Sequence, residues 1–217
     1  MDPTCPRPRL VSFTVLSLFL AAASALADPS AKPQPAKSPE GQTVRVLVAY
    51  YSRTGNTEKM AHGVGEGIKR VPGAVAVLQT IDEVTKDDLR SAHAIILGCP
   101  TYYAGIPGKT KAVLDEWAWH WGIDFTDKLG GAFATGGGQV GGKEHVVTSL
   151  LLYMLSNRMV VAGPLYEDTR GNGGIWGEPG SAAMTGPLDL AVSQQELDAA
   201  RRLGERIARL AQKFMAR

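Results

Sequence analysis

The chain has 217 residues, of which 44% are hydrophobic, which suffices for one domain with a sizeable core. Its formal net charge of +2 excludes the strongly basic surface that is typical of nucleic-acid-binding proteins. We therefore expect a globular protein with no nucleic-acid partner.

Residues 1–27 have the pattern of a Sec-type signal peptide. Arg7 and Arg9 precede an apolar run over residues 10–23, and the small residues Ala25 and Ala27 indicate cleavage after Ala27. The alternative is an uncleaved membrane anchor, although the apolar run is short for a bilayer span. We expect an exported protein, periplasmic or secreted, that keeps no stable membrane span after cleavage.

Residues 28–42 are rich in Pro, Ala, Ser and Lys, and this composition predicts a disordered linker because it cannot bury a core. The folded domain is expected over residues 43–217. Cleavage would leave Cys99 as the only cysteine, so no intramolecular disulfide is predicted, and Cys99 is expected to pack as a small hydrophobic residue. No His or Cys pair has metal-ligand spacing, so no metal site is predicted.

From residue 44 onward, apolar runs of strand length alternate with helical patterns. Strands are predicted over residues 44–49, 74–79, 92–99, 130–135 and 159–162. Helices are predicted over residues 58–70, 109–121 and 144–157, with a short helix and loop over residues 82–89. Residues 163–187 have no clear periodicity, and a capping box of Ser193 and Glu196 opens a last helix that extends through Phe214. This alternation predicts a three-layer α/β/α sandwich with a five-stranded parallel sheet.

The loop after the first strand has the features of a phosphate cradle. It lies between a buried strand and a helix start, where free backbone N–H groups and the helix dipole favour an anion. Gly55 lets the backbone approach a ligand, and Arg53 is the only cation of the loop; a cofactor phosphate, a nicotinamide phosphate and solvent are all open as its partner. The alternative is helix capping by the hydroxyl groups. The candidate residues are Ser52, Arg53, Thr54, Gly55, Asn56 and Thr57.

Two further loops follow strands in the same way. The second brings aromatic rings to the sheet edge, with candidate residues Pro100, Thr101, Tyr102, Tyr103 and Gly105. The third offers backbone amides with few side chains in the way, with candidate residues Thr135, Gly136, Gly137, Gly138 and Gln139. Taken alone, the second loop is explained equally well by ordinary loop packing, and the alternative for the third is a flexible loop. Because the carboxyl ends of parallel strands meet at one edge, where ligands bind, we expect the three loops to form one cofactor site.

Three tryptophans follow the second loop at short intervals. Trp117 fits the core-facing stripe of the predicted helix over residues 109–121. Trp119 or Trp121 could border the cofactor pocket, from the same chain or from a neighbouring subunit. The candidates for stacking against a substrate are therefore Tyr103, Trp119 and Trp121.

The three loops also carry a resemblance to known families. The sequence SRTGNT at residues 52–57 resembles the phosphate loop of flavodoxins, which holds the monophosphate of FMN. Most of the domain is similar to the WrbA-type NAD(P)H:quinone oxidoreductases, with matching stretches at residues 100–105, 135–139, 144–163 and 193–208. The resemblance implies a flavodoxin-like sheet of order 2-1-3-4-5 with FMN as the cofactor. It further implies NAD(P)H as the electron donor, a quinone-like acceptor and a homo-oligomer, dimer or tetramer.

The chain departs from the WrbA pattern at three places. One is the segment over residues 163–187, which lacks a clear match but ends in the small residues 181–184, where the family has a small-residue run near the pocket. The chain's first loop has a flavodoxin-like sequence, and Ser156 and Asn157 stand where the WrbA type carries a His near the flavin and the substrate. No catalytic side chain is assigned, because the cofactor performs the chemistry.

Three functions are consistent with this sequence. The first is an FMN-dependent oxidoreductase that passes electrons from NAD(P)H to a quinone or similar acceptor. The second is a flavodoxin-type electron carrier, against which the net charge of +2 argues because such carriers usually have a strongly acidic docking surface. The third is an exported flavin-binding module without nicotinamide-dependent turnover, since reduced nicotinamides are scarce outside the cytoplasm.

Overall fold

A computed structural model of the protein describes residues 43–138, 140–165, 179–186 and 191–216. The predicted signal peptide over residues 1–27 and the predicted linker over residues 28–42 lie outside these described residues. Within the described part, no helix combines the length and the apolar character that crossing a bilayer requires.

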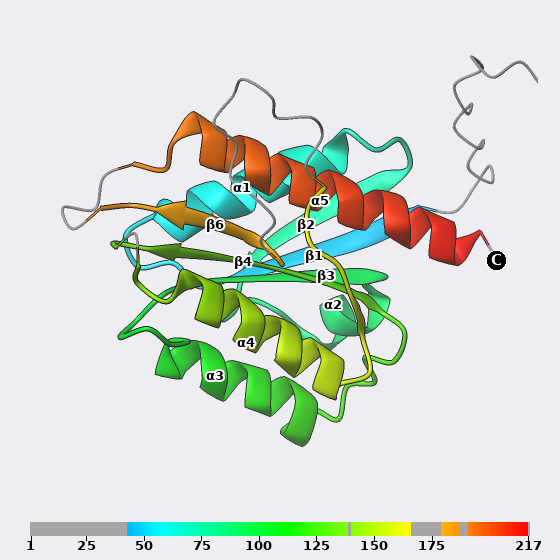
Figure 1. The fold of residues 1–217 in the computed structure, drawn as a ribbon. Coiled ribbons are helices and arrows are strands. Elements are labelled where there is room, and N and C mark those ends of the chain that lie inside the picture. The colour runs from blue at the N-terminus through cyan, green and yellow to red at the C-terminus, as the bar shows by residue number, and fades with distance from the viewer. Residues whose placement is uncertain (1–42, 139, 166–178, 187–190, 217) are drawn as a thin grey trace, which may run out of the picture. The chain divides into compact units, whose positions relative to one another are not determined.

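A parallel sheet forms the middle layer of the domain (Figure 1). Its strands have the order β2-β1-β3-β4-β5, and β6 also pairs with β4. The predicted order and the predicted α/β/α layering are thereby confirmed. The strands are β1 (Val44–Tyr50), β2 (Ala74–Thr80), β3 (Ala94–Pro100), β4 (Leu129–Gly136), β5 (Val160–Val161) and β6 (Ser181–Met184).

The fifth strand position of the sheet is filled by two separate pieces of chain. β5 pairs with Leu129 and Gly130 at the start of β4, and β6 pairs with Phe133 through Gly136 at its end. Phe133 also pairs with Gly98 of β3, so β6 must lie on the side of β4 that β5 occupies. The single strand predicted over residues 159–162 is therefore only the first piece of this position.

Helices cover both faces of the sheet. α1 (Asn56–Lys69) and α5 (Gln194–Met215) pack on one face, and α2 (Lys86–Ser91), α3 (Gly108–Asp115) and α4 (Lys143–Ser156) lie on the other (Figure 1). Successive side chains of β1 point to opposite faces of the sheet and belong to two hydrophobic cores. Leu47 packs in the core under α3 and α4, and Val48 packs in the core under α1 and α5. The capping box predicted at Ser193 and Glu196 is confirmed at the start of α5.

The helix predicted over residues 109–121 changes character partway. α3 ends at Asp115, and the chain continues as a π-helical turn, η1 (Glu116–His120). Trp117 in this turn is buried against the sheet, as its place on the apolar stripe predicted. π-helical turns have no distinctive sequence pattern here, so this one was not predicted.

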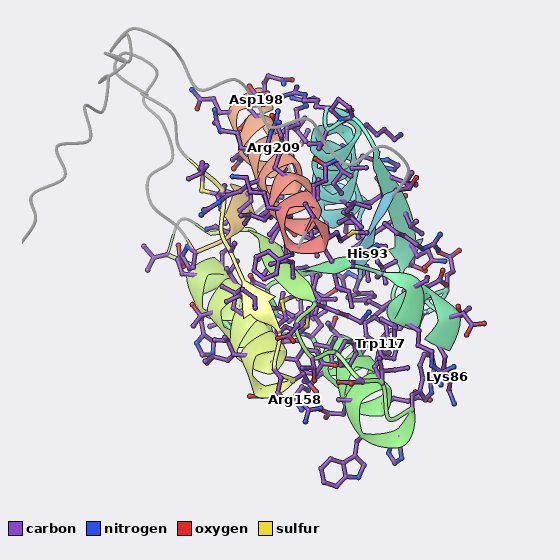
Figure 2. All side chains as sticks on the ribbon, turned by 90° about the vertical axis from the view of Figure 1, so that its right-hand side faces the viewer. Lys86, His93, Trp117, Arg158, Asp198 and Arg209 are labelled. Carbon is purple, nitrogen blue, oxygen red and sulfur yellow. The ribbon has the colours of Figure 1, made fainter. Side chains whose placement is uncertain are left out.

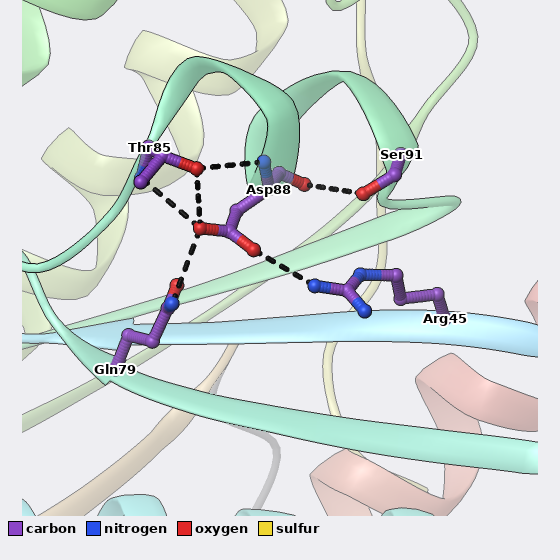
Figure 3. Close-up of polar contacts among 5 residues, drawn as sticks. All are labelled: Arg45, Gln79, Thr85, Asp88 and Ser91. Atoms are coloured by element: carbon purple, nitrogen blue, oxygen red, sulfur yellow. Dashed lines mark hydrogen bonds and ion pairs between the residues drawn. The ribbon is translucent and has the colours of Figure 1, made fainter.

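A carboxylate joins α2 to the first two strands at the opposite side of the domain from α5. The side chain of Asp88 accepts hydrogen bonds from the Thr85 hydroxyl at 2.6 Å, from Gln79 Nε2 of β2 at 3.1 Å and from Arg45 NH2 of β1 at 2.8 Å (Figure 3). Thr85 and Asp88 also form a capping box at the start of α2. These donors, the Thr85 hydroxyl foremost, lower the pKa of Asp88 against the opposing effect of burial.

We predict that Asp88→Asn lowers the free energy of unfolding at pH 7 by about 1–3 kcal/mol, because an amide cannot accept all of these hydrogen bonds. Since the pKa of Asp88 is lower in the folded state, its contribution is present above the unfolded pKa of about 3.9 and is lost as the pH falls through the folded value. Urea unfolding at pH 7 and at acidic pH measures both effects. The matched control is Asp87→Asn, whose side chain is 94% exposed, and an equal loss in the control would contradict the prediction.

Candidate functional site

The three predicted loops meet at one cavity at the carboxyl edge of the sheet, on the left in Figure 1. The cavity has a volume of about 280 Å³. Residues of the first, second and third loops and of the segment after β6 line the cavity. The lining residues are Arg53, Thr54, Asn56, Thr57, Pro100, Thr101, Tyr102, Thr135, Gly136, Gly137, Thr185 and Gly186.

The first loop closes tightly onto the start of α1. Gly55 is the N-cap of the helix with φ of 89°, in the left-handed region where glycine is favoured, and it provides no side-chain cap. The Ser52 hydroxyl accepts the backbone N–H groups of Gly55 at 3.2 Å and of Glu58 at 3.3 Å. Ser52 therefore holds the loop in shape, while Thr54 and Thr57 face the cavity.

A hydroxyl pair joins the first loop to the third. Thr57 Oγ1 lies 2.8 Å from Thr135 Oγ1, and both side chains are almost completely buried. Each hydroxyl can donate to one partner and accept from another, so the pair can also serve a ligand in the cavity. The spacing between the two loops is fixed by this contact.

The second loop forms a two-residue turn at the sheet edge. Tyr102 and Gly105 exchange backbone hydrogen bonds of 3.0 and 2.9 Å, with Tyr103 and Ala104 at φ of 48° and 63°. Two consecutive left-handed residues are typical of a type I′ turn, in which Asn and Gly are preferred. With Tyr and Ala in these places, the turn stores strain of about 1–3 kcal/mol per residue.

Gly142, the N-cap of α4, packs closely against this turn. A Cβ atom on Gly142 would lie 2.7 Å from Ala104 Cα, and Gly142 has φ of 87°. No larger residue fits between the turn and the helix without displacing one of them. The second loop and the start of α4 are thus in direct backbone contact.

Tyr102 is placed between two neighbours beside the cavity. Its ring meets Tyr51 edge to face with centroids 6.4 Å apart, and the Arg53 guanidinium lies 5.7 Å from its ring centroid. Burial raises the pKa of Tyr102, and the charge of Arg53 only partly offsets this effect. The phenol is therefore neutral at physiological pH and available as a hydrogen-bond donor.

The hydroxyl group of Thr101 indicates that the cavity suits a polar cofactor. Its Oγ1 atom is buried and has no hydrogen-bond partner among the described residues. It faces the backbone of Gly136, where an added Cβ would lie 3.3 Å away. A buried hydroxyl without a partner is costly, and a ligand with donor and acceptor groups would satisfy it. Together with the anion-binding first loop, it fits a phosphorylated flavin such as FMN.

Several predicted residues do not line the cavity. Of the described ones, Ser52, Gly55 and Gly105 shape their loops, and the Gly138 carbonyl accepts from Lys143. The side chain of Tyr103 is completely exposed. Gln139 lies outside the described residues.

The predicted substrate residues Trp119 and Trp121 lie at the opposite edge of the sheet within this chain. α3 and η1 carry the chain away from the cavity to the start of β4, where Leu129 pairs with Ala94. Figure 2 looks toward this edge, where β3 begins directly after His93. Trp121 lies beside Lys86, with 5.6 Å between the ammonium and the ring centroid, and Trp119 is 85% exposed. Neither Trp119 nor Trp121 is among the described residues that line the cavity, and a role at a neighbouring subunit stays a prediction.

Thr185 and Gly186 are cavity residues that the sequence did not indicate. They follow β6, and Thr185 N donates to the Gly136 carbonyl at 2.9 Å. The signal was weak because β6 consists of small residues without an apolar run. Cys99 contributes no chemistry to the site, since burial raises the pKa of its thiol to about 12.

Fold and cavity together define a flavodoxin-like α/β protein with a site for a phosphorylated cofactor at the carboxyl ends of β1, β3 and β4. Residues 79–167 match the family model described as NADPH-dependent FMN reductase. A relative from Geobacter sulfurreducens named NAD(P)H dehydrogenase (quinone) is 30% identical over 201 residues, covering 79% of this chain and 99% of the relative. The chain belongs to the WrbA-type family of FMN-dependent NAD(P)H:quinone oxidoreductases, as its sequence predicted.

Solved structures agree with this assignment. A WrbA-like flavodoxin protein from Agrobacterium tumefaciens has 26% sequence identity and a TM-score of 0.61, covering 79% of this chain and 99% of its own. An archaeal flavodoxin with 22% identity and a TM-score of 0.60 covers 77% of this chain and 99% of its own, and it supports the fold alone.

We predict that Gly142→Ala destabilises the protein by about 1–3 kcal/mol, because the alanine is strained at positive φ and meets the turn at Ala104. Thermal unfolding measures the loss. Gly108→Ala is the matched control, since its Cβ would have open space at the start of α3 and should leave stability nearly unchanged. An unchanged melting temperature in Gly142→Ala would show that turn and helix are not interlocked.

We predict that Thr54→Ala weakens FMN binding about tenfold, the effect of losing one hydrogen bond to a charged phosphate. Fluorescence titration of FMN with the purified protein gives the dissociation constant. Thr126→Ala, far from the cavity near the start of β4, should bind like the unaltered protein. Equal affinities of the Thr54→Ala variant and this control would mean that Thr54 makes no contact with the phosphate.

Proposed function

We propose that the protein binds FMN in the cavity of the three loops and uses it to reduce a quinone or a similar acceptor with electrons from NAD(P)H. The observation that carries the proposal is the convergence of hydroxyl groups, backbone amides and an aromatic ring on one cavity at the switch point of the sheet. When bound, the flavin supplies the hydride chemistry that no side chain here can provide.

The protein's own contribution is to bind and orient. The start of α1 and the hydroxyls of Thr54 and Thr57 would hold the phosphate, because helix N-termini favour anions. Thr101, Tyr102 and the backbone of Gly136 would contact the ring system, since they lie at the part of the cavity formed by the second and third loops. Arg53 adds the only positive charge among the described lining residues.

Tyr103 is the candidate residue on the substrate side of the site. Tyr103 stands fully exposed on the strained turn next to Tyr102, a position suited to stacking against a quinone or a nicotinamide. In a homo-oligomer, the exposed ring of Trp119 is available to a neighbouring subunit. A dimer or tetramer is proposed on this basis and on the family assignment.

The protein is also proposed to act outside the cytoplasm, in the periplasm or as a secreted protein. The support is the charged, apolar and small-residue pattern of residues 1–27, followed by the linker composition of residues 28–42. Its electron donor must then be available in that compartment. A quinone acceptor suits such a location, because quinones are apolar molecules that partition into membranes.

We predict that the purified protein has the visible spectrum of a bound flavin, or gains it when FMN is added. Anaerobic mixing with NADPH or NADH should bleach the flavin band, and a soluble quinone should restore it. No FMN binding would refute the proposed function altogether. Binding without bleaching by either nicotinamide would favour the electron carrier or the flavin-binding module instead.

A further inference from the structure

Lys143 is the most deeply buried lysine in the described part of the chain and lies next to the cavity. Its exposed fraction is 6%, and it is the first residue of α4. Its Nζ atom donates to the carbonyl oxygen of Gly138 at 2.7 Å, across the third loop.

Stability alone does not explain a lysine in this place. A positive charge in the first turn of a helix opposes the helix dipole, and burial of an ammonium group carries a large desolvation cost. The next residue, Glu144, has the charge that the dipole favours and is exposed. A local conflict of this kind is expected where a residue serves the function of a site.

The side chain of Lys143 packs directly against the cavity wall. A Cβ atom on Gly136, which lines the cavity, would lie 2.8 Å from Lys143 Cγ and 3.3 Å from Lys143 Cδ. The residue before it, Gly142, contacts the turn of the second loop at Ala104. Lys143 thus lies beneath the junction of the second and third loops.

We propose that Lys143 is a positioning and charge-tuning residue: it fixes the third loop through Gly138 and places a buried cation beside the cofactor, which favours the reduced flavin. This inference rests on the proposed function. When bound, FMN would accept a hydride from the reduced nicotinamide, which would leave as the oxidised cation, so the bound cofactor would gain one negative charge. The ammonium group of Lys143 would stabilise that charge.

The size of the effect follows from the distance dependence of charge interactions. At an effective dielectric constant of about 20, a unit charge within about 10 Å changes the equilibrium between oxidised and reduced bound FMN roughly tenfold or more. A tenfold change corresponds to about 30 mV for a two-electron couple. Charge near the flavin ring is a general means of tuning its electronic properties.

The test compares Lys143→Met with Lys143→Arg and with Lys69→Met, an exposed lysine at the far end of α1. For each protein, the dissociation constant of oxidised FMN and the midpoint potential of bound FMN are measured. Lys143→Met should lower the preference for reduced over oxidised FMN about tenfold. Lys143→Arg and Lys69→Met should keep the potential of the unaltered protein. If Lys143→Met does not fold, Lys143→Gln serves as the neutral variant.

A merely structural role predicts a different result. The neutral variant would then bind oxidised and reduced FMN less tightly by the same factor, and the potential would stay unchanged, which would overturn the charge-tuning role. Failure of the unaltered protein to bind FMN would overturn the proposed function and the charge-tuning role together. The positioning role is decided separately by hydrogen exchange in the FMN-free protein: amides of Gly137 and Gly138 should exchange faster in the neutral variant, and equal rates would overturn it.

Discussion

Parallel pairing of β1, β3 and β4 is the constraint on which the rest of the domain depends. Parallel strands need crossover connections, so each helix returns the chain to the opposite edge and each strand ends at the same one. The loops that follow these strands therefore all lie at the same edge of the sheet. A phosphate-binding turn, an aromatic turn and a glycine loop, far apart in sequence, thereby become the walls of one cavity.

The loops are then held at a fixed spacing by a few short contacts. The buried hydroxyl pair of Thr57 and Thr135 joins the first loop to the third, and the backbone contact of Gly142 with Ala104 joins the second to α4. Glu196 of α5 accepts from the backbone N–H of Met184 and so fixes the end of β6 beside the cavity. The site is built from preorganised backbone, which suits a cofactor that brings its own reactivity.

How much of this could be predicted depends on the local signal of each element. β3 and β4 are buried on both faces and therefore appear as continuous apolar or small runs, so their existence and order could be predicted. β6 could not, because Ser181, Ala182 and Ala183 are small residues that carry no hydrophobic pattern. The capping box of Thr85 and Asp88 has a weaker sequence signal, because Asp stands where Glu or Gln is usual.

The candidate site was predictable at the level of loops and less so at the level of side chains. Periodicity indicates where a strand ends, but it does not give the direction of a side chain in the turn that follows. Tyr102 faces the cavity and its neighbour Tyr103 faces solvent because of a strained turn that no propensity would favour. The distance of Trp119 from the cavity, by contrast, follows from the direction of the crossover helix and could have been deduced from the topology.

The division of the fifth strand position between β5 and β6 has a consequence for how this fold can diversify. Each piece has its own register on β4, and β6 is anchored at its end by α5, so neither depends on the length of chain between them. A change in the number of residues in that interval would therefore leave both pairings with β4, and with them the cofactor edge, in place.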